Sequence, residues 1–260
     1  MVNVKKKRIN TSYFVILLTF LALFSCKVNK EKVYEIEGKK ININDSQPIN
    51  SSIENFILPY RNHITKDLDS VLAYNPVVQE KSKGKWQTNI GNLFAETTLA
   101  LSNPVFNTRE NKTIDFCLLN HGGIRSIIPQ GNVTSRTAFE IMPFENSVTI
   151  VGLKGSEVRT LADYFIKEKK PHPLARITIY TNADETAVTD IKVNENSIDD
   201  DKIYYVATTD YLANGGDSMN FFRDSTIKYD LDYKLRNLFI DYFKKIDTIP
   251  NITTERILIK

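Results

Sequence analysis

The chain has 260 residues, of which 42% are hydrophobic and 25% charged, with 10 glycines and 9 prolines. This composition is ordinary for a folded domain, so it excludes disorder along the whole length. The length leaves room for one sizeable core or for two small domains.

The first 26 residues indicate export. A basic stretch at residues 5–8 precedes an apolar run at residues 13–24 that is too short to span a bilayer comfortably, which is typical of a secretory signal. Leu23 and Ser25 before Cys26 resemble the bacterial lipobox, and that resemblance implies cleavage before Cys26 and a lipid on its thiol. We therefore expect a membrane-anchored lipoprotein of the bacterial cell envelope. A transmembrane anchor, or a plain signal with an incidental cysteine, is the alternative.

The signal also accounts for the positive charge. The whole chain has a formal charge of +3, with 34 basic and 31 acidic residues. Removal of residues 1–25 takes away four basic residues and no acidic one, which leaves a charge of −1. No basic surface remains to indicate a nucleic-acid partner. With Cys26 lipidated, Cys117 is alone in an apolar run and is expected to be a small buried hydrophobe.

The rest of the chain divides into a polar tether, residues 26–52, and a folded domain, residues 53–260. Apolar residues at intervals of three and four predict helices, and short apolar runs predict strands. The mixture without strict alternation favours an α+β fold, with a mixed β-sheet and packed helices. The predicted elements are helices at 53–68, 89–101 (capped by Asn89), 156–169 and 231–245, a polar loop at 102–112, and strands at 71–78, 114–119, 147–153, 177–180, 188–193 and 203–209.

Two glycine motifs each follow an apolar strand. The first is Asn120-His121-Gly122-Gly123-Ile124-Arg125, in which the glycines would permit positive φ and close approach to a ligand. The amide of Asn120 and the guanidinium of Arg125 would face that ligand, and a guanidinium suits phosphate or carboxylate. A plain turn is the alternative.

The second motif contains Tyr211, Gly215, Gly216 and Asp217. The tyrosine ring offers a flat face to a base, and the carboxylate can accept hydrogen bonds from ribose hydroxyls. The alternative is a tight hairpin with the Tyr211 ring in the core and Asp217 capping a helix. Between the motifs, Phe144 follows a proline and either stacks on a ligand or is an ordinary core residue.

Five segments in order resemble the C-terminal domain of the 5′-nucleotidase family. They extend over nearly all of the chain after residue 52, and their order and approximate spacing match the family. The segments are Ile90-Gly91-Asn92-Leu93-Phe94-Ala95-Glu96, Leu119-Asn120-His121-Gly122-Gly123-Ile124-Arg125, Met142-Pro143-Phe144-Glu145-Asn146, Leu153-Lys154-Gly155 and Tyr211-Leu212-Ala213-Asn214-Gly215-Gly216-Asp217.

The resemblance implies a domain that binds the nucleoside of a nucleotide. It implies a base between the rings of Phe144 and Tyr211, where stacking contributes roughly 1–3 kcal/mol per base. It also implies that Asp217 contacts ribose, Asn120 the nucleoside, and Arg125 phosphate or ribose.

Two positions depart from the family. His121 stands where the family usually has a glycine, so it either costs backbone strain or adds a donor to the ligand. The arginine that family members often carry at the end of the helix after Gly-Asn-Leu is missing, and Arg109 falls in the predicted loop. Phosphate contacts are therefore less well supported than base stacking.

Family enzymes hydrolyse the phosphoester with two metal ions held in a separate N-terminal domain. This chain has three histidines, His63, His121 and His172, and no Asp-x-His or Gly-Asn-His motif, so we assign it no metal site, no cofactor and no catalytic residue. We expect the metal pair in a partner chain, a metallophosphatase with which this domain would act in nucleotide catabolism. The alternatives are a non-catalytic nucleoside- or nucleotide-binding surface lipoprotein and a degenerate structural lipoprotein.

Overall fold

The computed structural model describes residues 11–23, 35–44 and 46–260. Two units form, Met1–Ser51 and Ser52–Lys260. The first contains the exposed helix α1, Thr11–Leu23, and no described helix is long and apolar enough to cross a membrane. Cys26, the predicted lipidation site, lies outside the described residues, and the division into signal, tether and domain stays a prediction.

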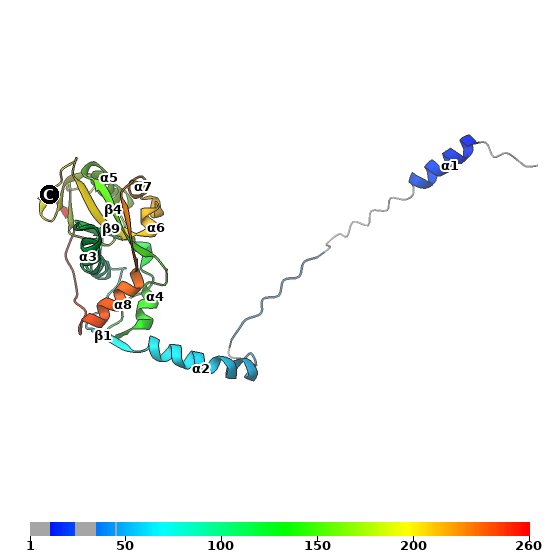
Figure 1. Cartoon of the computed structure of the whole chain (residues 1–260), viewed down its shortest axis with the longest axis horizontal. Helices are drawn as coiled ribbons and strands as arrows, with labels where there is room; N and C mark the ends of the chain where they lie inside the picture. Colours follow the sequence, from blue (N-terminus) through cyan, green and yellow to red (C-terminus); the bar gives the residue numbers. More distant parts are fainter. Residues whose placement is uncertain (1–10, 24–34, 45) are drawn as a thin grey trace, which may run out of the picture. The chain divides into compact units, whose positions relative to one another are not determined.

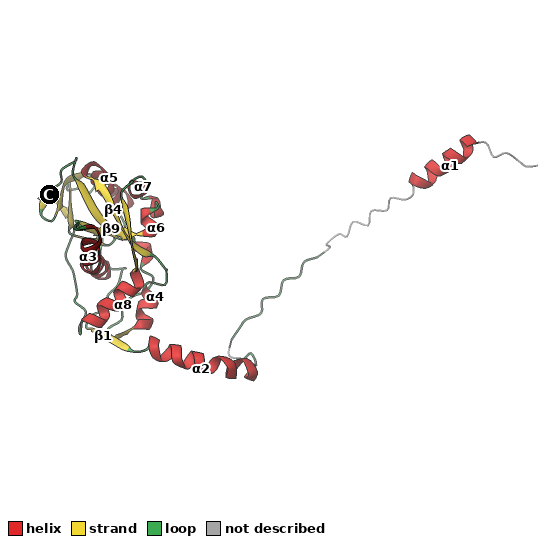
Figure 2. Cartoon of the chain, viewed as in Figure 1, coloured by secondary structure: helices red, strands yellow, loops and turns green. Residues whose placement is uncertain are grey.

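The second unit mixes short strands with helices, as Figures 1 and 2 show. Its helices are α2 Ser51–Leu68, α3 Asn89–Glu110, η1 His121–Gly123, α4 Ser135–Ile141, α5 Gly155–Glu168, α6 Asp210–Ala213, η2 Gly216–Ser218, α7 Asn220–Arg223 and α8 Leu235–Lys245. Its strands are β1 Val71–Asn75, β2 Phe116–Leu118, β3 Gly131–Thr134, β4 Ser147–Lys154, β5 Leu174–Ala175, β6 Ile177–Thr181, β7 Val188–Val193, β8 Asn196–Ser197, β9 Ile203–Thr209, β10 Lys228–Lys234 and β11 Ile257–Ile259.

A five-stranded sheet in the order β10-β4-β9-β2-β5 forms the centre of the domain. β4 and β9 pair antiparallel from Val148↔Thr209 to Lys154↔Ile203, whereas β2 and β9 run parallel with Phe116 opposite Val206. A second sheet, β11-β6-β7-β8, and the pair β1-β3 complete the strands. The mixture of parallel and antiparallel pairs confirms the predicted α+β fold with a mixed sheet.

Both faces of the central sheet are covered, because its strands carry apolar residues on both faces. Val148 and Ile150 of β4 pack with the residues of α3 and α8, while Val151 and Leu153 of the same strand pack with α5 and the second sheet. Seven of the eight β4 residues are buried. The sheet therefore separates two hydrophobic clusters, and ligands can approach only at its edges and ends.

Helix α3 is longer than predicted. It continues through Pro104 to Glu110, so the polar loop predicted at 102–112 is wrong. Ser102 and Phe106 are buried, and the Phe106 ring packs 5.3 Å from the Tyr229 ring, so tertiary packing outweighs local polarity. Thr88 caps the helix instead of the predicted Asn89, because its hydroxyl accepts the Gly91 N–H at 3.0 Å.

The ends of two other elements also differ from prediction. Leu231 belongs to β10, and α8 begins at Leu235, because residues 228–234 pair with β4 before the chain turns into the helix. Leu231 and Leu235 share the same cluster, so the apolar spacing alone could not separate strand from helix. The strand predicted at 71–78 ends at Asn75.

Helix α2 forms as predicted, with Pro59 inside it, but it buries none of its residues. Phe56, Tyr60 and Ile64 are 70%, 62% and 55% exposed. Its end is joined to the domain by the ion pair between Asp69 and Arg136. The apolar side of α2 is therefore open over most of its length.

The contrast between α8 and α2 gives a test of this packing. The Phe239 ring is fully buried, with its centroid 3.9 Å from that of Phe94, so Phe239→Ala should lower the free energy of unfolding by about 3–5 kcal/mol. Phe56→Ala is the matched control and should change it by less than about 0.5 kcal/mol. Urea unfolding of both variants measures the difference, and equal effects would contradict the described packing.

Candidate functional site

The first glycine motif forms a compact turn after β2. Asn120 is extended, with φ −94°, and His121–Gly123 make one turn of 3₁₀ helix. A Cβ on Gly123 would lie 2.7 Å from Asn120 Oδ1, so glycine is needed for the Asn120 side chain to fold over the turn. Neither Gly122 nor Gly123 has positive φ, and neither does His121. Gly123 provides space here, and the expected backbone cost of His121 is absent.

Arg125 connects this turn to the loop that carries Phe144. Its backbone N–H donates to Ile141 O at 2.8 Å, and its Nη1 donates to Gly122 O at 3.2 Å. The guanidinium carbon lies 5.7 Å from the Phe144 ring centroid, within range of a cation–π contact. Phe144 is 47% exposed, which excludes the core alternative. Arg125 and Phe144 therefore present one charged and one flat group side by side.

Lys81, which the motifs did not identify, lies next to this turn. Its Nζ donates to Ile124 O at 2.6 Å, and burial, followed by the nearby charge of Arg125, lowers the pKa of its ammonium group. Burial and then Lys81 lower the pKa of His121. Within the described part of the chain neither Lys81 nor Arg125 has a carboxylate partner. The turn is consequently a positive surface that suits an anion.

The second glycine motif holds Tyr211 at the surface after β9. Thr209 caps α6 by accepting the Leu212 N–H at 3.3 Å. Gly215 needs glycine because its φ is +91°, and a Cβ on Gly216 would lie 2.4 Å from the Tyr211 ring. The Tyr211 ring therefore lies directly over Gly216. It is 46% exposed, so the hairpin alternative with Tyr211 in the core is wrong.

Asp217 faces the Tyr211 hydroxyl. That hydroxyl donates to Asp217 Oδ1 at 3.0 Å, and the side chain of Asp217 is exposed. Asp217 and Ser218 both have positive φ, 51° and 62°, which is uncommon for residues with a side chain. The loop is held in a strained conformation that presents one carboxylate oxygen beside one aromatic ring.

One hydrogen bond joins the Phe144 loop to the Tyr211 loop. Asn146 Nδ2 donates to Asp210 Oδ1 at 2.9 Å. An open depression of about 610 Å³ lies there, lined by Asn146, Asp210, Tyr211, Asn214, Gly215 and Gly216. The structure thus brings Arg125 to Phe144 and Tyr211 to Asp217, and it links the two pairs through Asn146. Asn120 stands at the opposite end of the first turn.

His172 and Tyr164 lie beneath these loops, and motif reading did not identify them. His172 Nδ1 accepts the His121 N–H at 3.2 Å, and the Tyr164 hydroxyl donates to Asp217 O at 2.8 Å. Burial lowers the pKa of His172 to about 4, so the ring is neutral at physiological pH. In the sequence, only the prolines on both sides of His172 indicate that the backbone is rigid at this residue.

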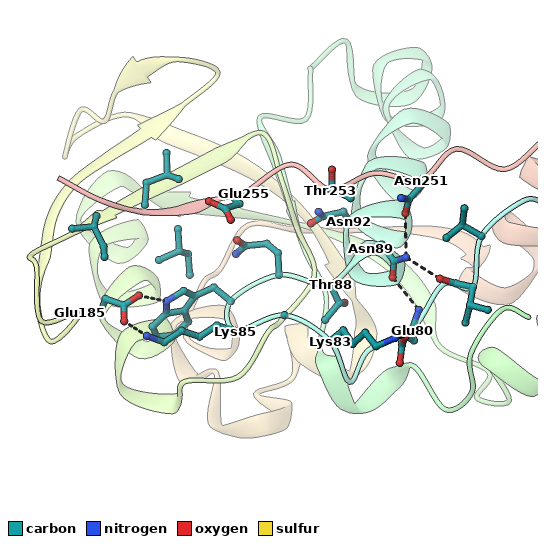
Figure 3. Close-up of a pocket in the computed structure, with 18 residues that line it drawn as sticks. Glu80, Lys83, Lys85, Thr88, Asn89, Asn92, Glu185, Asn251, Thr253 and Glu255 are labelled. Atoms are coloured by element: carbon teal, nitrogen blue, oxygen red, sulfur yellow. Dashed lines mark hydrogen bonds and ion pairs between the residues drawn. The ribbon is translucent and has the colours of Figure 1, made fainter.

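A larger depression, of about 670 Å³, lies elsewhere (Figure 3). It runs between the 83–89 loop and residues 251–259, where Glu185 accepts from Trp86 Nε1 at 2.8 Å and forms an ion pair with Lys85. None of the five predicted binding residues lines it.

Among the described residues, no three His, Cys, Asp or Glu side chains gather as metal ligands, so these residues do not fit a metal pair.

The sequence profile described as 5′-nucleotidase, C-terminal domain, matches residues 65–224. The chain belongs to this family. Its matched region includes both glycine motifs, Phe144, Tyr164 and His172.

Relatives and solved structures agree with this family. The chain is 26% identical to protein UshA of Yersinia enterocolitica over 72% of its own length and 34% of that protein. It is 25% identical to human 5′-nucleotidase over 84% of its length and 42% of that protein. The fold matches a 5′-nucleotidase precursor from Thermus thermophilus with a TM-score of 0.65 at 20% identity, over 82% of this chain and 44% of that chain. The chain therefore spans less than half the length of these proteins.

The buried His172 predicts a pH-dependent stability. Its pKa is near 6.5 when unfolded and about 4 when folded, where Asp217 and Glu168 raise the pKa and His121 and Lys170 lower it. Between those values the unfolded chain binds the extra proton, so stability falls as pH falls from 6.5 towards 4. From pH 7 to pH 5 the loss from this group should be about 2 kcal/mol in urea unfolding.

His172→Asn should remove that loss, because asparagine retains an acceptor but does not titrate. His63→Asn is the control: it replaces an exposed histidine on α2, and the loss attributed to His172 should persist in it. An identical pH dependence in wild type and His172→Asn would contradict a neutral, buried His172.

Proposed function

We propose that this domain binds the nucleoside part of a nucleotide, with the base between the rings of Phe144 and Tyr211. The observation that carries the proposal is the exposure of these two rings, 47% and 46%, on loops joined by the Asn146–Asp210 hydrogen bond. Large rings held in surface loops supply the flat faces on which a base stacks.

The polar groups around the rings fit the rest of a nucleotide. Asp217 uses Oδ1 to accept from Tyr211, and its second carboxylate oxygen can accept from a ribose hydroxyl. The amide of Asn120 contacts the nucleoside. Arg125, with Lys81 beside it, supplies the positive charge for phosphate. Arg109, predicted in a loop, lies in the last turn of α3, where its Nη1 donates to Leu231 O at 2.9 Å, so we assign the phosphate contact to Arg125 and Lys81.

We further propose that hydrolysis depends on a metallophosphatase supplied as a separate chain. The metal pair would polarise the phosphoester and activate water, and the residues described in this domain offer no ligand set for it. This chain would contribute specificity: it would bind the nucleoside and orient the phosphate. With residues 1–25 as a lipoprotein signal and lipid on Cys26, the pair would act at the bacterial cell envelope. The alternative is a surface lipoprotein that binds nucleosides or nucleotides without catalysis.

Binding calorimetry with AMP and adenosine tests the first proposal. Phe144→Ala and Tyr211→Ala should each weaken binding about 5- to 150-fold, the ratio that corresponds to one stacked base. The matched controls are Phe56→Ala and Tyr60→Ala, which remove still more exposed rings on α2 and should leave affinity unchanged. Absence of binding by the wild type, or unchanged affinity in the loop variants, would reject the proposed site.

Mixing experiments separate the two roles of the protein. AMP hydrolysis is assayed with divalent metal for this chain alone, for a candidate metallophosphatase chain alone, and for the mixture. If the two chains form one hydrolase, the mixture should exceed the sum of the separate rates, and Phe144→Ala should remove most of the gain. AMP binding without any gain on mixing would favour the non-catalytic lipoprotein.

A further inference from the structure

The two glycine loops begin at the same end of the central sheet, where two neighbouring strands finish. β2 and β9 are parallel neighbours, and the loops that follow them carry Asn120–Arg125 and Tyr211–Asp217 respectively. Parallel pairing brings the carboxyl ends of both strands to the same end of the sheet. It does not set the conformation of the loops that follow the strands. Something outside the ladder must hold each loop in place.

His172 holds the first loop. It lies between Pro171 and Pro173, directly before β5, which pairs with β2. Its Nδ1 accepts the backbone N–H of His121 at 3.2 Å, so the proton of the neutral ring is on Nε2. The side chain is 1% exposed, and its ring centroid lies 5.3 Å from that of Phe165. A buried ring between fixed prolines is a rigid acceptor for the turn.

Tyr164 holds the second loop. It projects from α5, and its hydroxyl donates to the backbone oxygen of Asp217 at 2.8 Å. This bond acts on the part of the loop where Asp217 and Ser218 have left-handed φ values. Such a conformation persists only where the surroundings fix it. The Tyr164 hydroxyl is one of the groups that fix it.

The two holding residues touch each other. The ring centroids of Tyr164 and His172 are 5.9 Å apart, at an interplanar angle of 46°. The contacts run from His121 through His172 and Tyr164 to Asp217. These contacts join loops whose residues are more than 50 positions apart in the sequence.

We propose that Tyr164 and His172 are positioning residues: together they hold the two glycine loops in one mutual arrangement, so that Asn120, Arg125, Tyr211 and Asp217 face one nucleotide. The consequence for binding rests on the proposed function, whereas the coupling of the loops does not. Tyr164 and His172 lie under the loops and act through backbone groups. The Tyr164 ring couples the loops, and its hydroxyl holds only the second one.

Hydrogen–deuterium exchange of the full, ligand-free chain tests the coupling, with peptides that contain residues 119–126 and 210–219. Tyr164→Phe should speed exchange about fivefold in the second peptide only, the ratio expected for one hydrogen bond. Tyr164→Ala, which also removes the ring, should speed exchange in both. His172→Leu should speed exchange in the first, and His172→Asn, which restores an acceptor, should reverse that effect. Tyr233→Phe, which removes a hydroxyl bonded to Asp241 elsewhere in the domain, should change neither peptide.

AMP calorimetry on the same variants supplies the functional readout. Tyr164→Phe and His172→Leu should weaken AMP binding about fivefold or more, with recovery in His172→Asn and no change in Tyr233→Phe. Exchange that stays at the wild-type rate in the first peptide of Tyr164→Ala would overturn the coupling. If Phe144→Ala weakens AMP binding but the Tyr164 and His172 variants do not, the positioning role is wrong. A wild type that does not bind AMP refutes the proposed function, and exchange still decides the coupling.

Discussion

The parallel pairing of β2 with β9 is the constraint on which the rest of the candidate site depends. Val206 and Ala207 of β9 are fully buried, and they stand opposite Phe116 and Cys117 of β2. On its other side β9 pairs with β4 over seven residues, so it cannot shift without breaking a ladder that separates two hydrophobic clusters. Because β9 is fixed, the positions of the strand ends at which both glycine loops begin are also fixed.

The two glycine loops are held in their conformations in different ways. In the first loop Gly123 makes room, since a Cβ at this position would meet the Asn120 side chain. In the second loop the backbone itself is strained: Asp217 and Ser218, which carry side chains, have positive φ. A loop that needs only space can rest on one buried acceptor, His172, whereas a strained loop needs further support. The Tyr164 hydroxyl and the bond between Asn146 and Asp210 provide it.

Much of this arrangement was predictable from sequence, because strong apolar periodicity marks the buried faces. The strands at β4 and β9, the helix at α5 and the two glycine turns lie within a few residues of their predicted positions. The end of α3 was not predictable, because Phe106 is buried by rings from distant strands and the local sequence around Pro104 is polar. Leu231 lies in β10 and not in the predicted helix, because a strand followed by a helix can bury the same spacing of leucines.

The roles of His172 and Tyr164 could not be predicted from sequence for a related reason. His172 meets His121, and Tyr164 meets Asp217, across more than 50 residues each, so no local pattern contains either contact. The exposure of Phe144 and Tyr211 was likewise undecided, since a ring after a proline or before a glycine fits a core as well as a surface. Only the sheet order, which sets which loops are neighbours, resolves these cases.

The charged groups of the candidate site suit the binding of an anion. Lys81 and Arg125 are positive and lack a carboxylate partner among the described residues, so their side chains attract an anion. His172 could exchange a proton, but burial lowers its pKa to about 4, and its Nδ1 is occupied by the His121 N–H. A histidine that stays neutral and bonded to the backbone serves as a fixed acceptor. The groups near the loops therefore supply position and charge.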